Sequence, residues 1–200
     1  MMAVKMAKVI RLVKQSRTAK FLQEYNDERG YIGPQWLNVE GAVYNLDGMP
    51  RITSEEEFGK TFDIKKDKCR VDFMDLPEWL DFERWQDGEL RADELEITIG
   101  TRDDVYRVFR YKGGTEKGSM LVRTAYLEPF GDNMEILYTV RKSADGTPYL
   151  CVMDGVLLAA IIFPVNVAYE RRLVLKNEIE QVVKELERSL AWDRVNANQK

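Results

Sequence analysis

The stretch Thr147-Pro-Tyr-Leu-Cys-Val-Met-Asp-Gly-Val-Leu-Leu-Ala-Ala-Ile-Ile-Phe163 decides the fold. It places an Asp-Gly pair between two apolar segments, Tyr149–Val152 and Val156–Phe163. Asp-Gly is among the strongest short signals for a β-hairpin, because both residues tolerate a positive φ. The second segment has no polar face, which is typical of a strand in the middle of a sheet that is covered on both sides. We therefore expect this hairpin to lie at the core of the protein.

The chain before this hairpin alternates between polar and apolar residues from Glu94 onward, with turn residues at the joints. After Pro164, apolar residues recur every three or four positions from Leu175 to Leu190, which predicts an amphipathic helix suited to lie on a sheet. We predict an α+β fold: an antiparallel β-meander of about six strands over Glu94–Phe163, covered by this C-terminal helix and by smaller helices of the N-terminal half. The predicted strands are Glu94–Ile99, Val105–Tyr111, Ser119–Leu127, Met134–Lys142, Tyr149–Val152 and Val156–Phe163.

The N-terminal half predicts a mixture of helices and strands. Val4–Val13 suits either a strand or the first part of a helix, and we favour a strand. A helix capped by Ser16 or Thr18 is predicted to follow and to end at Gly30. Further along, the pattern predicts a hairpin around Glu40-Gly41, a helix with a capping box at Ser54–Glu57, and a helix from Asp75 to Gly88 with Pro77 in its first turn.

The hairpin around Glu40-Gly41 shares its order of an aromatic residue, Leu, one residue, Val and a glycine turn with the hairpin around Asp154-Gly155. The match is short and does not extend to either side, so we interpret it as a coincidence between two hairpins that can lie in one sheet. We expect a single domain over residues 1–200, with a mixed N-terminal half (1–93), the meander and its helix (94–195) and a frayed tail (196–200).

Composition excludes several chemistries. The chain has no histidine, which removes the serine and cysteine triads that use imidazole and the common zinc sites. Cys69 and Cys151 have no metal-like spacing, so we expect free buried thiols in a reducing compartment. The N-terminus lacks the apolar region of a signal peptide, and no apolar run approaches the ~20 residues that cross a bilayer. We expect a cytoplasmic protein that is not an enzyme and that uses no cofactor or metal.

Charge is distributed unevenly along the chain. Residues 1–23 carry six bases and no acid, whereas residues 24–104 carry 22 acids and 10 bases. The acids gather between Asp72 and Glu96, where aromatic residues lie among them. On a helix, Phe82 and Trp85 fall away from the face shared by Leu76, Trp79 and Leu80, so the helix has more aromatic surface than one core face requires.

This pattern favours a docking surface, in which aromatic anchors are ringed by carboxylates. Its partner would be a protein with a basic groove or a nucleic-acid-binding surface, and the protein would act as an inhibitor or an adaptor. The plainer alternative is a solvated acidic helix whose extra aromatic residues pack under neighbouring loops. We name the predicted acidic-aromatic surface by its six residues: Asp75, Glu78, Trp79, Asp81, Phe82 and Trp85.

Two alternatives come from other classes. A nucleic-acid-binding protein would use the basic N-terminal arm and arginines on a sheet face, although strand alternation divides those arginines between the two faces. An edge strand whose lysines block aggregation explains the arm equally well. A histidine-free carboxylate or magnesium enzyme would need Asp47 and Asp63 to converge with the acids of 72–96 in one cleft. The nucleic-acid candidates are Lys5, Lys8, Arg11, Arg107, Arg110, Arg123 and Arg141.

Overall fold

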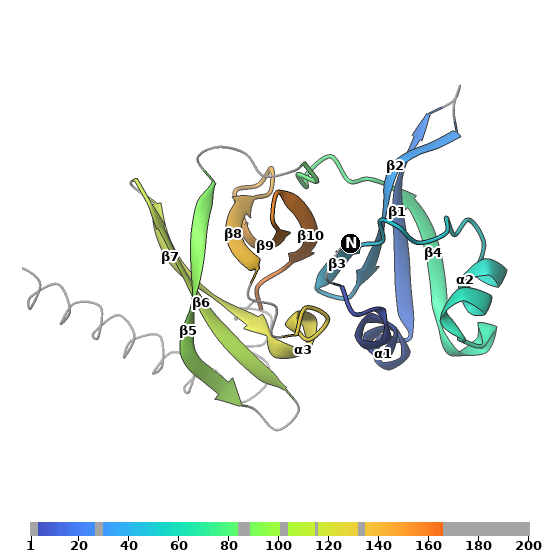
Figure 1. The fold of residues 1–200 in the computed structure, drawn as a ribbon, viewed down its shortest axis with the longest axis horizontal. Helices are drawn as coiled ribbons and strands as arrows, with labels where there is room; N and C mark the ends of the chain where they lie inside the picture. The colour runs from blue at the N-terminus through green and yellow to red at the C-terminus, as the bar shows by residue number, and fades with distance from the viewer. Residues whose placement is uncertain are drawn as a thin grey trace, which may run out of the picture. The chain divides into compact units, whose positions relative to one another are not determined.

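The computed structural model describes residues 4–26, 30–83, 89–100, 104–114, 116–131 and 135–165, which belong to one compact unit. Ten strands of these residues form one continuous sheet in the order β4-β1-β2-β3-β10-β9-β8-β5-β6-β7 (Figure 1). Strands β1 and β4 are parallel and the other pairings are antiparallel, so the sheet is mixed. The strands are β1 (Thr18–Asn26), β2 (Gly30–Val39), β3 (Ala42–Asn45), β4 (Arg70–Asp75), β5 (Leu90–Gly100), β6 (Val105–Gly113), β7 (Glu116–Arg123), β8 (Ile136–Lys142), β9 (Pro148–Asp154) and β10 (Leu157–Ile162).

The hairpin of β9 and β10 lies at the centre of this sheet, as its sequence predicts. β10 pairs with β9 on one side and with β3 on the other. Its residues from Ala159 to Ile162 are fully buried. Ile161 packs with Trp36 on one face of the sheet, whereas Ile162 packs with Leu150 on the other. The unbroken apolar run therefore corresponds to a strand covered on both faces.

The predicted α+β fold with an antiparallel meander is wrong, because the sheet is mixed and extends across both halves of the chain. Within 94–163 most of the strands lie where the pattern predicts, but β8 pairs with β5 through Leu90↔Val140 and not with β7. The predicted strand Ser119–Leu127 ends at Arg123, where the short helix α3 (Thr124–Leu127) turns the chain away from β7. Alternation locates strands but does not choose their partners. The predicted C-terminal helix over Leu175–Leu190 lies outside the described residues.

The first two predicted elements are also wrong, since a helix precedes a strand. Helix α1 spans Met6–Ser16, because Val9, Leu12 and Val13 follow the helical repeat and bury one face. It ends at Arg17, whose φ of 59° is left-handed. The Ser16 hydroxyl donates to the Val13 carbonyl at 3.2 Å and accepts from the Thr18 amide at 3.3 Å, so it closes α1 where we expected it to begin a helix.

Two other local predictions for the N-terminal half, the hairpin around Glu40-Gly41 and the helix that begins at Ser54, are confirmed. β2 and β3 form the hairpin around Glu40-Gly41, with Val39 opposite Ala42. Helix α2 (Glu55–Phe62) begins with the Ser54 hydroxyl accepting from the Glu57 amide at 3.2 Å. The 3-10 helix η1 (Lys66–Lys68) then leads into β4. The rings of Phe58 and Phe62 pack against Phe21 of β1, with 5.7 and 6.4 Å between the ring centroids. Helix α2 therefore covers β1.

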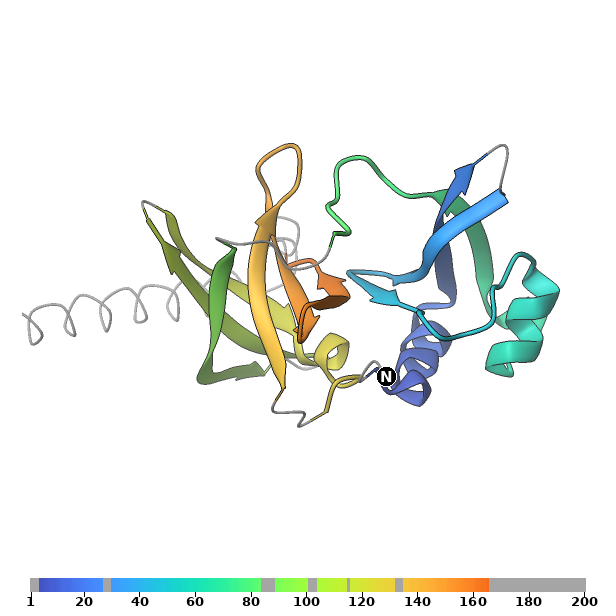
Figure 2. The same cartoon turned by 45° about the horizontal axis from the view of Figure 1, so that its top comes forward.

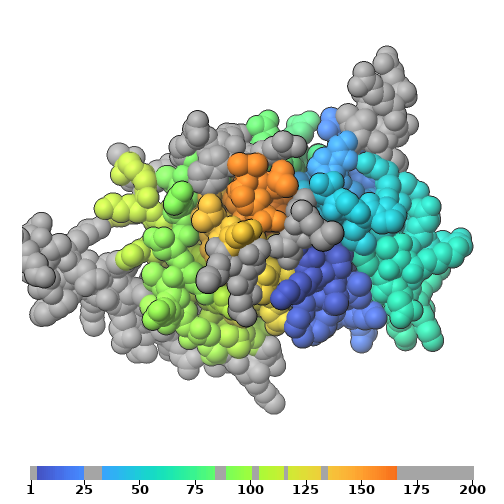
Figure 3. All heavy atoms as spheres, viewed as in Figure 1, coloured from blue at the N-terminus to red at the C-terminus, as the bar shows by residue number. Residues whose placement is uncertain are grey.

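The two central hairpins occupy equivalent places. β1-β2-β3 and β8-β9-β10 are three-stranded antiparallel runs whose last strands meet as an antiparallel pair, with Ala160 opposite Tyr44 (Figure 2). Each run follows a helix, α1 or α3, and Lys8 of α1 forms an ion pair with Glu128 at the end of α3. The two hairpins thus lie in one sheet, as expected, and they are joined by the pairing of β3 with β10. In Figure 3 the atoms of β10 (orange) lie next to the atoms of the N-terminal strands (light blue).

Both cysteines are free and buried, as expected. Burial raises the pKa of Cys151 to about 12, which leaves roughly one thiol in ten thousand ionised at pH 8. We therefore expect iodoacetamide to leave Cys151 unmodified in the folded protein at pH 8 and to alkylate it fully in concentrated urea. Mass spectrometry of tryptic peptides measures both states. Rapid alkylation of Cys151 in the folded protein would contradict its burial in the central hairpin.

Among the described residues, no helix combines the length and the apolar character needed to span a bilayer.

Candidate functional site

The segment 76–83 follows β4 and crosses one face of the sheet without forming a helix (Figure 1). The predicted helix from Asp75 to Gly88 is therefore wrong over its described part, because the sheet binds the backbone groups that a helix would use internally. The Tyr149 hydroxyl accepts from the Asp81 amide at 3.1 Å. Arg141 donates to the Asp81 carbonyl at 3.1 Å and to the Glu83 carbonyl at 2.9 Å. These bonds hold residues 81–83 against the sheet in a non-helical conformation.

Arg141 on β8 is the main ionic contact of this segment. Its guanidinium and the carboxylate of Glu89 are each only 7% exposed, and they form an ion pair through Nε at 3.0 Å and through Nη2. Asp81 adds a second carboxylate at 3.4 Å. Burial lowers the pKa of Arg141, but the neighbouring Cys151 and the hydrogen bond to Glu89 raise it on balance. The guanidinium therefore stays charged and is neutralised by the protein's own carboxylates.

The acidic-aromatic surface divides into exposed and packed residues. Asp75 and Glu78 are exposed, and Trp79 is 49% exposed with its ring 5.8 Å from that of Phe163. Phe82, in contrast, lies with its ring 4.9 Å from Trp36 and joins the buried cluster of that face, while Asp81 is tied to Arg141. Trp85 lies outside the described residues. Among the described residues of this surface, Trp79 is thus the one exposed aromatic side chain, and it lies beside acidic neighbours.

A pocket of about 660 Å³ lies beside Phe82. Its wall combines β2, β3 and the turn after it, the 82–83 segment and the start of β10. Sequence reasoning missed this pocket because its residues come from four separate parts of the chain. The sequence indicated Asp47 only as a possible metal ligand. The described residues that line the pocket are Gly33, Pro34, Trp36, Asn45, Asp47, Phe82, Glu83, Leu157 and Leu158.

The nucleic-acid candidates do not gather on one surface. Lys8 and Arg11, on α1, both pair with Glu128, and Lys5 lies at the start of that helix. Arg107 and Arg110 lie on β6, and Arg107 pairs with Glu94 at 3.0 Å. Arg123 ends β7, and Arg141 is buried under the segment 76–83. Carboxylates of the protein therefore occupy most of these cations.

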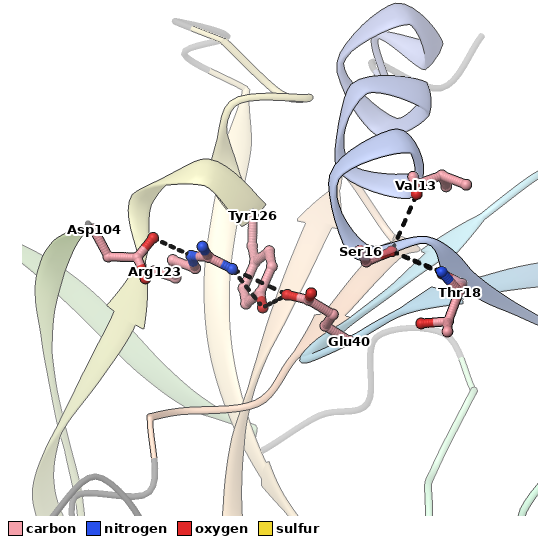
Figure 4. Close-up of polar contacts among 7 residues, drawn as sticks. All are labelled: Val13, Ser16, Thr18, Glu40, Asp104, Arg123 and Tyr126. Carbon is pink, nitrogen blue, oxygen red and sulfur yellow. Dashed lines mark hydrogen bonds and ion pairs between the residues drawn. The ribbon is translucent and has the colours of Figure 1, made fainter. Parts of the chain in front are cut away.

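Arg123 belongs to a polar cluster that joins the two halves of the sheet (Figure 4). It pairs with Asp104 at 2.5 Å and with Glu40, in the β2–β3 turn, at 3.0 Å. The Tyr126 hydroxyl donates to Glu40 at 3.0 Å, and its ring lies 3.1 Å from where a side chain on Gly41 would begin. Burial lowers the pKa of Arg123, but its hydrogen bonds to Tyr126 and Asp104 raise it on balance. Because Asp104, Glu40 and Tyr126 bind the Arg123 guanidinium, few of its N–H groups are available to bind a phosphate.

The carboxylates of the magnesium hypothesis do not converge either. Asp47 lines the pocket beside Phe82, whereas Asp63 ends α2 in a left-handed conformation with φ of 51°. Within the described part of the chain, no group of three or more carboxylate or cysteine side chains is placed to hold a metal ion.

Comparisons of the chain with protein-family models, with curated proteins and with solved structures gave no match, so the case for a function rests on the site itself.

Proposed function

We propose that the protein binds a protein partner with a basic surface, as an inhibitor or an adaptor, through the exposed part of the acidic-aromatic surface. The observation that carries this proposal is Trp79, a large apolar side chain that is half exposed on a segment whose backbone is bound to the sheet. Tryptophan is among the residues most enriched at binding hot spots. An anchor that is already held in place loses little conformational entropy when a partner covers it.

The charge around Trp79 supports a basic partner. Residues 72–83 carry five acids and no base. The side chains of Asp75 and Glu78 are exposed to solvent. Carboxylates at the rim of an interface attract a basic surface and exclude an acidic one, which contributes mostly to association rate and specificity. We place this activity in the cytoplasm, where the free thiols of Cys69 and Cys151 would persist.

Truncation of the anchor tests the proposal. We expect Trp79→Ala to reduce capture of the partner from native-host lysate by about tenfold or more, because a hot-spot tryptophan contributes roughly 2 kcal/mol or more to binding. Glu78→Lys should also weaken capture, and the effect should be larger at low salt than at high salt. Quantitative mass spectrometry of the pull-downs measures capture, and thermal unfolding verifies the fold.

Val105→Ala supplies the control, because Val105 is 44% exposed at the start of β6, which lies four strands from β10 in the sheet. It should leave capture unchanged. Equal capture by wild type and Trp79→Ala would contradict the proposal. A large fall in the melting temperature of Trp79→Ala would show instead that Trp79 supports the fold.

A further inference from the structure

We propose that the pocket beside Phe82 receives a cationic side chain of the partner, an arginine or a lysine. This inference rests on the proposed function and adds the chemistry that the partner must carry. Its basis is a pocket of about 660 Å³ whose described wall is aromatic and aliphatic, with carboxylates as its charged members. That combination fits a cation on an aliphatic stem.

The apolar part of the wall suits the stem. Phe82 and Pro34 present apolar surface, Leu157 and Leu158 contribute the start of β10, and Trp36 lies behind Phe82 with 1% exposure. Long basic side chains bury their methylene groups on such surface while the charged end reaches water or a carboxylate. The volume lies within the range of ordinary ligand pockets and exceeds what one side chain needs, which leaves space for water around the charge.

The charged part of the wall suits the cationic end. Among the described residues that line the pocket, the charged ones are Asp47 and Glu83, and both are exposed. The nearby cation Arg51 donates to the Gly33 carbonyl at 2.8 Å and to the Gln23 side chain at 3.1 Å. A cation that enters the pocket would meet the carboxylate of Asp47, and Glu83 adds a second acidic side chain to the wall.

The carboxylate of Asp47 extends from a backbone that is fixed before binding. The side-chain Nδ2 of Asn45 donates to the Leu158 backbone carbonyl at 3.0 Å, at the irregularity in the β9–β10 register. The side-chain Oδ1 of Asn45 accepts from the Asp47 backbone amide at 2.8 Å. One buried side chain thus connects β10, β3 and the turn that carries Asp47. Such preorganisation lowers the cost of binding.

The pocket is also within reach of the proposed anchor. Phe82 follows Trp79 by three residues, which limits the distance between their Cα atoms to about 11 Å. An extended partner segment of a few residues can cover Trp79 and place a basic side chain in the pocket. We therefore expect the partner to carry an arginine or lysine within about three residues of the position that contacts Trp79.

Small probes test this pocket without the partner. The probes are N-acetyl-arginine-N-methylamide, the matching lysine compound and the matching norleucine compound, which keeps the stem and lacks the charge. The readout is the indole N–H signal of Trp36 in a proton–nitrogen correlation spectrum, assigned with Trp36→Phe. We expect the cationic probes to shift this signal with dissociation constants about tenfold lower than that of the norleucine probe.

The double variant Asp47→Asn, Glu83→Gln should weaken the cationic probes by about tenfold or more and leave the norleucine probe unchanged. The matched control, Asp75→Asn with Glu78→Gln, removes two carboxylates outside the pocket wall and should leave probe binding unchanged. Equal binding of norleucine and arginine probes would overturn the inference. Binding that survives the double variant, or no shift with any cationic probe, would overturn it as well.

The outcomes separate this inference from the proposed function. Trp79→Ala should leave probe binding intact while it reduces partner capture. If Trp79→Ala reduces capture but no cationic probe binds, the pocket inference fails and the proposed function stands. If the probes bind and capture does not depend on Trp79, the proposed function fails and the pocket remains a cation site.

Discussion

Replacement of Arg141 with methionine is expected to lower the free energy of unfolding by about 3–5 kcal/mol. The guanidinium and its partner Glu89 are both 7% exposed, so the substitution leaves a buried carboxylate without its arginine. It also removes the donor from the carbonyls of Asp81 and Glu83. Methionine keeps most of the side-chain volume, which confines the loss to charge and hydrogen bonds. Urea titration followed by tryptophan fluorescence measures the change, with an unchanged m-value as the sign of an intact fold.

Arg107→Met is the matched control. Its ion pair with Glu94 is 37% and 33% exposed, so its loss should lower the free energy of unfolding by less than about 1 kcal/mol. Glu89→Gln in the Arg141→Met background should recover part of the loss, because it removes the buried charge that lacks its arginine. Equal effects of Arg141→Met and Arg107→Met would show that the buried pair does not hold the segment 76–83.

The Arg141 contacts also link stability to the proposed site. Arg141 and Tyr149 hold the backbone around Asp81, and Trp79 and Phe82 lie on either side of this point. Loss of Arg141 should therefore increase local opening of 76–83 more than opening of the central hairpin. The sequence predicts that Arg141 lies on a strand, which made it a candidate for nucleic-acid binding. The sequence does not show that the carboxylate of Glu89 neutralises this arginine.

Local signals in the sequence were sufficient for the elements that depend on neighbouring residues. Asp154-Gly155 predicts the central hairpin because turn geometry is set by the residues that form it. The capping box of Ser54 and Glu57 predicts α2 for the same reason. The apolar run Val156–Phe163 further predicts a central strand, since only a position covered on both sides buries both of its faces.

Distant contacts decide the elements that the sequence did not predict. Pro77 and the apolar residues after it are compatible with a helix, but Tyr149 and Arg141, more than 50 residues away, bind the backbone of 81 and 83. Similarly, β8 pairs with β5 through Leu90 and Val140, which lie far apart in the sequence. The pocket beside Phe82 has the same origin, because its wall exists only after β2, β3 and β10 have come together.

Ile161→Ala is expected to lower the free energy of unfolding by about 2–5 kcal/mol, the usual cost of such a truncation in a packed core. Ile161 is fully buried in β10, between Val43 of β3 and Cys151 of β9. Val156→Ala, in the same hairpin, should change stability by no more than about 0.5 kcal/mol, because Val156 is 61% exposed. Urea titration of the three proteins measures both effects. A cost below 1 kcal/mol for Ile161→Ala would contradict a central position for β10.

Ile162→Ala separates the two faces of that strand. Ile162 is also fully buried, but it packs with Leu150 on the opposite face of the sheet. Its truncation should cost about as much stability as that of Ile161. Only Ile161 shares a buried cluster with Trp36 and Phe82, so only its truncation should shift the Trp36 indole signal and weaken cationic probes in the pocket. An equal response of that signal to both variants would mean that the pocket is coupled to the sheet as a whole and not to the one face that carries segment 76–83.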